Sequence, residues 1–261
     1  MSDMLTFLGT SDAQGVPRMM CDCPVCTSYD PIHKRRRSSV LFASEGSVML
    51  LDVSPDFREQ FLQYGNKRIP DTVLITHCHN DHIGGFGDFG DLCFWNKRHC
   101  QVISPTTNIE LLHARFPYLL KRRGIEYIAA DVWQRGKWQI SFHTVNHGQN
   151  GHSCGIRFQS TGCTWAYVPD SFGMDDGQLR SFVGCDLLVL GTSYYKEKAE
   201  RSRRSVYDVS EAIELKKQLG ITQLVLTHLS HDIDIPQHSK TLPPGIRFAH
   251  DGLSLPLPYS S

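Results

Sequence analysis

The chain has 261 residues, of which 40% are hydrophobic and 21% charged, as expected for a globular protein that buries a sizeable core. Its 27 basic and 27 acidic residues balance, so no overall field favours nucleic acid or an anionic membrane as a partner. Apolar runs such as residues 73–75 and 187–190 are far too short to span a bilayer. Residues 1–10 lack the basic start and long apolar stretch of a signal peptide, and we therefore expect a cytoplasmic protein.

Short apolar, β-branched segments predict nine strands, and helical patterns predict four helices. The strands cover residues 5–8, 39–42, 48–52, 72–76, 101–103, 139–145, 164–168, 187–190 and 223–227. The helices cover residues 55–64, 108–122, 176–182 and 209–219. Early strands follow one another closely and later ones alternate with helices, which indicates an α/β protein with helices packed outside its sheets. We find no repeat or long linker and expect one domain over residues 1–261.

Several predicted strands end in residues that can bind a metal ion. Asp52 ends one strand, His77 directly follows another, and Asp170 and His228 come just after two later strands. Side chains at strand ends and in the loops that follow them can converge at one edge of a sheet. The sequence therefore predicts a site assembled from distant parts of the chain.

The run His77-Cys78-His79-Asn80-Asp81-His82 is the strongest feature of the sequence. Imidazole and carboxylate groups are typical ligands of borderline divalent metals, whereas calcium and magnesium prefer oxygen throughout. Four such groups within six residues cannot all reach one ion comfortably. They can serve two adjacent ions, His77 and His79 at one and Asp81 and His82 at the other. The alternative is a polar loop with exposed histidines.

This run resembles the His-x-His-x-Asp-His motif of the metallo-β-lactamase superfamily, and the resemblance extends along the whole chain. It implies an αββα sandwich of two mixed sheets with helices on the outer faces, and a hydrolase with two divalent ions, zinc or manganese. It also implies that one ion is held by His77, His79 and His147, the other by Asp81, His82 and His228, with Asp170 as the bridge. Among these, His147 competes with His143 and His152, and Asp170 also fits a turn.

Cys21, Cys23 and Cys26 form a second cluster, whereas the other six cysteines are scattered among apolar residues. Without an export signal the thiols stay reduced, and three thiolates leave one corner of a tetrahedral zinc site open. With the segment 9–17, this cluster is similar to the phosphodiesterases that act on cyclic phosphates in the carbon–phosphorus lyase pathway. That similarity implies a zinc-binding loop at residues 21–26, with His231 as the fourth ligand. A pyrroloquinoline-quinone biosynthesis protein of the same fold has a related cysteine pattern.

The sequence departs from that subgroup at Val206. The resemblance places a general-acid histidine there, two residues before Asp208, and valine cannot donate a proton. Substitutes within or near the loop 192–205, which has the composition of a lid or a solvated loop, are Tyr194, Tyr195, Lys196, Arg204, Tyr207 and His152.

Two further segments admit more than one interpretation. The basic run at residues 33–38 fits either a phosphate grip or a solvated turn. Asp52 and Asp56 are candidates to orient metal-binding histidines.

We expect a phosphodiesterase that cleaves a small cyclic phosphodiester with a hydroxide shared by two metals and oriented by Asp81. The alternatives are thioester or lactone hydrolysis, a redox step of cofactor biosynthesis, and a metal-binding protein without catalysis. We expect a small-molecule substrate and neither nucleic acid nor a membrane as partner. A homodimer is compatible with the sequence, which does not define the oligomeric state.

Overall fold

The computed structural model describes residues 3–257, and these form two seven-stranded sheets. The first sheet has the order β14-β1-β2-β3-β4-β5-β6 and consists of β1 (Asp3–Gly9), β2 (Ser39–Ser44), β3 (Ser47–Leu51), β4 (Thr72–Leu74), β5 (Cys100–Ser104), β6 (Ile125–Ala129) and β14 (Ser254–Leu257). The second has the order β13-β12-β11-β10-β9-β8-β7 and consists of β7 (Val132–Arg135), β8 (Trp138–Asn146), β9 (His152–Ser160), β10 (Cys163–Val168), β11 (Leu187–Gly191), β12 (Gln223–Thr227) and β13 (Ile246–Phe248).

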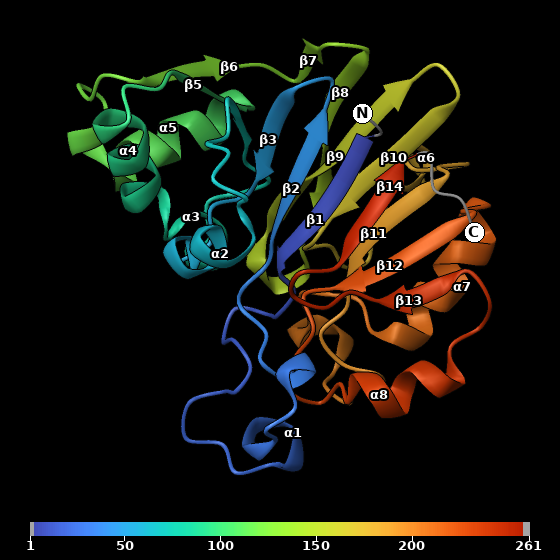
Figure 1. Cartoon of the computed structure of the whole chain (residues 1–261). Helices are drawn as coiled ribbons and strands as arrows, with labels where there is room; N and C mark the ends of the chain where they lie inside the picture. The colour runs from blue at the N-terminus through green and yellow to red at the C-terminus, as the bar shows by residue number, and fades with distance from the viewer. Residues whose placement is uncertain (1–2, 258–261) are drawn as a thin grey trace.

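Both sheets are mixed, and helices cover their outer faces (Figure 1). Strands β14 to β3 pair antiparallel and β3 to β6 parallel; in the second sheet β7 to β10 are antiparallel and β10 to β13 parallel. The helices are α1 (Pro24–Thr27), α2 (Phe57–Tyr64), α3 (Asn80–Ile83), α4 (Phe86–Trp95), α5 (Thr106–Arg115), α6 (Asp176–Arg180), α7 (Val209–Leu219) and α8 (Ile235–His238). The αββα arrangement implied by the resemblance is confirmed.

The core between the sheets is built around aromatic side chains. Phe42 of the first sheet packs edge-on against Trp138, Phe158 and Trp165 of the second, with ring centroids 5.1–5.4 Å apart. Each such side chain contributes about 1.5–3 kcal/mol when fully buried. Two further buried clusters lie outside the sheets, one under α2, α4 and α5 and one under α7. The sheets are therefore fixed from both sides, which gives their ends a rigid position.

All nine predicted strands are present. Five further strands were not predicted, and some helices begin or end at other residues than predicted. The helix predicted over residues 108–122 ends at Arg115, because Pro117 follows and cannot continue the hydrogen-bond ladder. Helix α4 lies in a glycine-rich segment whose composition disfavours a helix. It forms because its apolar face is buried under the first sheet. None of the helices within residues 3–257 is long and apolar enough to cross a membrane.

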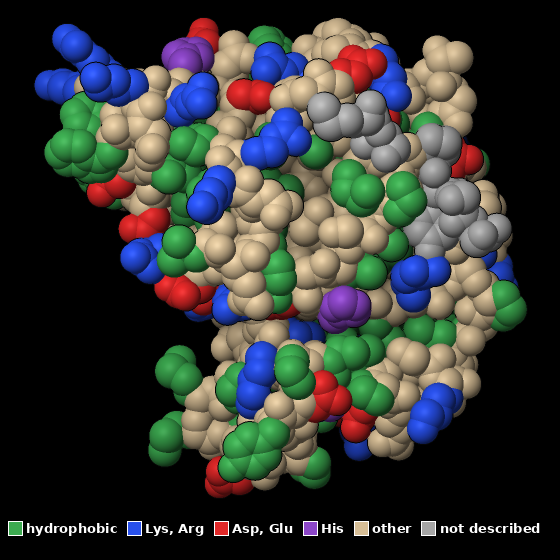
Figure 2. All heavy atoms as spheres, viewed as in Figure 1, with side chains coloured by type: hydrophobic (Ala, Val, Ile, Leu, Met, Phe, Trp, Pro, Cys, Tyr) green, Lys and Arg blue, Asp and Glu red, His purple; other side chains and the backbone are tan. Residues whose placement is uncertain are grey.

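The connection between β1 and β2, residues 10–38, projects from one end of the sandwich and carries α1 (Figure 1). We call it the cysteine loop. Its tip exposes Met19, Met20 and Tyr29 almost completely, and apolar side chains are visible on the projecting lower part of Figure 2. At its base, Ser11 bridges to Leu229, so the loop joins the segment that follows β12.

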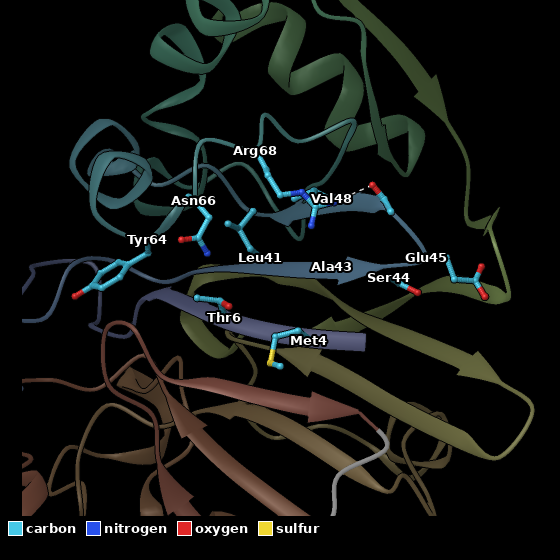
Figure 3. A pocket seen from close by; sticks show the side chains of 12 residues that line it. Met4, Thr6, Leu41, Ala43, Ser44, Glu45, Val48, Tyr64, Asn66 and Arg68 are labelled. Atoms are coloured by element: carbon cyan, nitrogen blue, oxygen red, sulfur yellow. Dashed lines mark hydrogen bonds between the residues drawn. The ribbon is translucent and has the colours of Figure 1, made fainter. Parts of the chain in front are cut away.

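The outer face of β1, β2 and β3 carries a cavity of about 220 Å³ (Figure 3). Met4, Leu41 and Tyr64 are among the side chains that line it. None of the described residues that line it is a histidine or a cysteine. The cavity is therefore not the metal site that the sequence predicts.

Candidate metal centres

The first group of ligands consists of His77, His79 and His147, whose candidate ligand atoms all lie within 4.8 Å of one another. His77 and His79 follow β4, and His147 follows β8. The Nε2 atom of His77 lies 2.9 Å from Nδ1 of His79, so the two ring nitrogens face each other. Burial and the neighbouring His82 lower the pKa of His77, and burial lowers that of His147. Both rings are thus neutral, the form that binds metal.

The second group consists of Asp81, His82, Asp170 and His228. Helix α3 carries Asp81 and His82, whereas Asp170 follows β10 and His228 follows β12. The Nε2 atom of His82 lies 2.7 Å from Oδ2 of Asp170 and 3.1 Å from Oδ2 of Asp81. The Nε2 atom of His228 lies 3.4 Å from Oδ1 of Asp170. Residues separated by almost 150 positions therefore meet at one point.

The backbone around His228 is adapted to this meeting. His228 has φ 57°, a left-handed conformation that costs a non-glycine residue of order 1–3 kcal/mol. Gly191 ends the adjacent strand β11, where a Cβ atom would lie 1.6 Å from the carbonyl oxygen of Pro169. Only glycine lets the loops that carry Asp170 and His228 approach this closely.

Asp170 is the residue that joins the two groups. Its Oδ1 atom lies 3.6 Å from Nε2 of His147, in the first group, while Oδ2 contacts His82 in the second. The Oδ2 atom of Asp170 and the Nε2 atoms of His82 and His228 are buried, and although Oδ2 lies 2.7 Å from Nε2 of His82, none of the three makes a hydrogen bond of good geometry. Buried polar atoms without a partner cost about 1–3 kcal/mol each, so these atoms fit ligands of metal ions better than a metal-free network.

Both carboxylates of the second group are ionised. Burial alone would raise the pKa of Asp81, but His82 and His228, whose Nε2 atoms lie 3.1 and 3.5 Å from its Oδ2 atom, outweigh burial and hold that pKa well below its usual range. Burial likewise opposes ionisation of Asp170, and His228 and His82 lower its pKa far more. Burial opposes a charge on His82 and His228, but Asp81 and Asp170 raise the pKa of both rings, so without metal the four groups form an ion-paired cluster. A divalent cation would replace the protons of these imidazoles, and two carboxylates with two imidazoles are a donor set suited to it.

Asp52 orients His82 from behind. It is fully buried, and its Oδ2 atom accepts a hydrogen bond from Nδ1 of His82 at 2.7 Å, which directs Nε2 toward Asp170. The backbone N–H of Thr76 donates to the other carboxylate oxygen at 2.8 Å. The expected orienting role of Asp52 is confirmed. That of Asp56 is wrong, because Asp56 accepts hydrogen bonds from the backbone and the guanidinium of Arg37.

Replacing Asp52 by asparagine is expected to weaken metal binding at the second group by about 10–100-fold. The amide can still accept from His82 but places N–H groups against the Thr76 donor. Chelator competition followed by metal analysis measures the change. Asp56→Asn, which alters only the contact with Arg37, is the control, and equal affinities in the two variants would contradict this orienting role.

The cysteine loop forms the third group, Cys21, Cys23, Cys26 and His231. The three sulfur atoms lie 3.1, 3.5 and 3.6 Å from Nδ1 of His231. Tetrahedral zinc with ordinary Zn–S and Zn–N distances places neighbouring ligand atoms roughly 3.6 Å apart. Burial and the nearby Arg18 lower the pKa of His231, which favours the neutral ring. The four residues implied by the resemblance thus lie together in an arrangement that fits zinc.

The three arginines of the basic run at residues 33–38 are engaged within the protein, which fits neither a phosphate grip nor a solvated turn: Arg36 and Arg37 pair with Asp251 and Asp56. Arg35 is buried and donates from Nη2 to the carbonyl oxygens of Ser230 and Ile233, 2.8 and 3.2 Å away. It therefore holds the segment that carries His231.

A pocket of about 190 Å³ opens onto the first two groups. Val206 is part of its wall, at the position where the resemblance places a histidine, and Tyr194 lies beside it. Most of the other candidate proton donors are engaged elsewhere. Tyr207 accepts a hydrogen bond from the N–H of Met174, and Tyr195 contacts Thr241.

Arg204 pairs with Glu211, and His152 lines a neighbouring groove of about 630 Å³ that shares His79 and Asn150 with the pocket. Of the candidate donors, only Tyr194 therefore lines the pocket itself.

Four residues of the cysteine loop also line the pocket: Asp12, Ala13, Gln14 and Arg18. They were not predicted as site residues. Gln14 belongs to the segment 9–17 that carries part of the subgroup resemblance, but nothing in the local pattern marks Asp12 or Arg18. Only the packing of the loop against the segment after β12 brings them to the metal groups.

Known proteins share this fold and this family. The model of the beta-lactamase superfamily domain matches residues 48–229. A diphosphatase from the PhnP family superposes with a TM-score of 0.86 at 30% identity, covering 98% of this chain and 97% of that one. Zn²⁺-bound PqqB from Methylobacterium extorquens superposes with a TM-score of 0.80 at 17% identity, covering 97% and 100%.

A curated relative shares 31% identity over 94% of this chain, an octanoyltransferase from Porphyromonas gingivalis. The chain spans about half the length of that protein, since the match covers 50% of it.

Proposed function

Because the chain belongs to the beta-lactamase superfamily, we propose that it is a binuclear metal-dependent phosphodiesterase acting on a small cyclic phosphodiester. The observation that carries this proposal is the position of Asp170 between two ligand groups that open onto one pocket. The similarity of the chain to a PhnP-family diphosphatase supports a substrate that contains phosphate. We infer that the protein acts in the cytoplasm on a small molecule, without nucleic acid as a partner.

These groups would hold two divalent ions, which would supply Lewis acidity and lower the pKa of a coordinated water to about 7 in the zinc case. The side chains of the pocket would orient the attacking water and the ligand groups. Asp81, kept ionised, accepts a hydrogen bond from the attacking water and orients it. Asp170 keeps the two ligand groups at a fixed separation, so that attack and departure occur on opposite sides of one phosphorus atom. Val206 provides no proton, which favours substrates whose leaving group is strained or acidic.

The size of the pocket supports a compact reacting group. Its volume of about 190 Å³ is below the ~300 Å³ at which sites for drug-sized ligands begin. A cyclic phosphodiester fits this size, and ring strain lowers its need for a general acid.

The adjoining groove, about 630 Å³, favours a second candidate. A diphosphate with a larger organic group could place its reacting phosphate in the pocket and that group in the groove. This is the chemistry in the name of the PhnP-family relative.

The proposal is tested with protein loaded separately with zinc, manganese and iron. The substrates are bis(p-nitrophenyl) phosphate, a ribose cyclic phosphate, a dinucleoside diphosphate and a thioester. Cleavage of the cyclic phosphate, lost in Asp81→Ala, is the expected result, and preference for the diphosphate would support the second candidate. If neither bis(p-nitrophenyl) phosphate nor the ribose cyclic phosphate is cleaved while Asp81→Ala abolishes thioester turnover, the phosphodiesterase proposal is wrong.

A further inference from the structure

Arg18 is the one arginine or lysine among the described residues that line the pocket of the metal groups. We propose that Arg18 binds the non-bridging phosphate oxygens of the substrate, and that zinc on the cysteine loop makes its guanidinium available for this. The inference rests on the proposed phosphodiesterase function. It adds to that function a residue for substrate recognition and a role for the third metal group.

The cysteine loop holds Arg18 at the pocket. Its backbone N–H donates to Sγ of Cys26 at 3.2 Å, so its position depends on the cysteine cluster. Its Nη2 atom donates to Oδ2 of Asp12 at 2.9 Å, which fixes one side of the guanidinium. The Nε atom is buried without a partner, and the side chain is only 18% exposed. Arg18 therefore has an oriented guanidinium, and the N–H groups that remain to bind a ligand are those of Nη1 and Nη2, since Nε is buried.

The charges around the pocket favour an anionic ligand for Arg18. Three carboxylates, Asp12, Asp81 and Asp170, line the pocket; Asp12 is paired with Arg18, and two bound divalent ions would more than offset the other two. The guanidinium of Arg18 has the planar fork that matches two phosphate oxygens at once. The arginines of the basic run do not line the pocket, since Arg35, Arg36 and Arg37 are each bound to other parts of the chain.

The contact between Arg18 and His231 links recognition to zinc. The Nη1 atom of Arg18 lies 3.1 Å from Nε2 of His231, whose other nitrogen faces the three sulfur atoms. A neutral histidine that binds zinc through Nδ1 must carry its proton on Nε2. Two N–H donors then face each other and cannot form a hydrogen bond. Arg18 Nη1 is thus without an acceptor when zinc is bound and is free for a phosphate oxygen, whereas the other tautomer of His231 accepts its hydrogen bond.

The test measures binding as well as turnover. Inorganic phosphate is titrated calorimetrically into metal-loaded protein, and KM and kcat are measured for the phosphodiester cleaved by the wild type. Arg18→Gln is expected to raise the Kd for phosphate and KM by about 10–100-fold, as for loss of a hydrogen bond to a charged group. Arg18→Lys retains the charge but not the planar fork of the guanidinium, and its Kd and KM are expected to lie between those of the wild type and Arg18→Gln. Arg58→Gln, an exposed arginine paired with its neighbour Glu59, is the matched control and leaves both constants unchanged.

The role of zinc is tested by combining Arg18→Gln with Cys23→Ser. If zinc acts through Arg18, the two changes weaken phosphate binding by less together than the product of their separate effects. Multiplicative effects would overturn this link. Metal analysis of Arg18→Gln, expected to retain zinc, excludes zinc loss as the cause of its phenotype, and a thermal melt checks that each variant is folded.

The outcomes separate this inference from the proposed function. Wild-type protein that cleaves a phosphodiester, with Arg18→Gln equal to Arg58→Gln in phosphate binding, overturns the assignment of Arg18 alone. Wild-type protein that cleaves no phosphodiester at all overturns the proposed function. Equal losses of Arg18→Gln on a phosphodiester and on an uncharged thioester would show that Arg18 acts on the metal groups generally, and this also contradicts phosphate recognition.

Discussion

Replacing Asp170 by asparagine is expected to reduce kcat by about 10³-fold, equivalent to ~4 kcal/mol of transition-state stabilisation. The substitution keeps the shape of the side chain and removes its charge. Asp170 is the contact between the two groups, 3.6 Å from His147 on one side and 2.7 Å from His82 on the other. Without its charge, His82 and His228 lose the carboxylate that both of them face.

Metal analysis gives a second measurement of the same variant. We expect at least one of the two ions of the pocket to be lost on dialysis, while zinc on the cysteine loop is retained. Asp176→Asn, in the first turn of α6 and outside the pocket, is the control. Full metal content together with undiminished turnover in Asp170→Asn would show that Asp170 does not bridge.

Replacing Cys23 by serine is expected to remove one tightly bound zinc per chain and to lower the melting temperature markedly. Structural zinc contributes about 10–16 kcal/mol in isolated zinc-finger peptides, and the cysteine loop has few buried apolar side chains to replace it. For a chain of this size, losing even ~4 kcal/mol lowers Tm by roughly 10 °C. Cys23 also caps α1 by accepting the N–H of Cys26, a contact that serine can keep.

Zinc content by mass spectrometry and Tm by calorimetry check this expectation. Cys163→Ser serves as the control because Cys163 is buried in the core between the sheets, away from all three ligand groups. It is expected to lower Tm slightly and to leave the metal content unchanged. A Cys23→Ser protein with the zinc content of the wild type would rule out zinc on the cysteine loop.

The ligand residues at positions 77–82 and 21–26 could be predicted from the sequence because their signal is local. His77 to His82 occupy six consecutive positions after an apolar strand, and Cys21 to Cys26 occupy six more. His147, Asp170 and His228 lie far apart in the chain, and the family resemblance identified them. The structure places each of them beside its expected partners.

What the sequence could not predict depends on contacts between distant segments. Arg35 belongs to a basic run that suggests a surface, yet it is buried because carbonyl oxygens about 195 positions away accept its N–H groups. Strand β9 was missed because Gly155 and polar residues interrupt its pattern, and its pairing with β8 and β10 overrides that weak propensity. The position of Arg18 at the pocket could not be predicted either, because only the packing of the cysteine loop brings it there.

His228 and His231 stand three residues apart on a single segment that Arg35 holds by the carbonyl of Ser230. Metal bound at either end restrains the remaining motion of this segment, and the entropic cost of that restraint arises once, whichever centre fills first. Binding at either centre therefore raises the affinity of the other, and by thermodynamic linkage the two gains are equal. The protein is thus expected to acquire its ions cooperatively, with zinc on the cysteine loop lowering the free-metal concentration at which the ligand groups of the pocket fill, and the reverse.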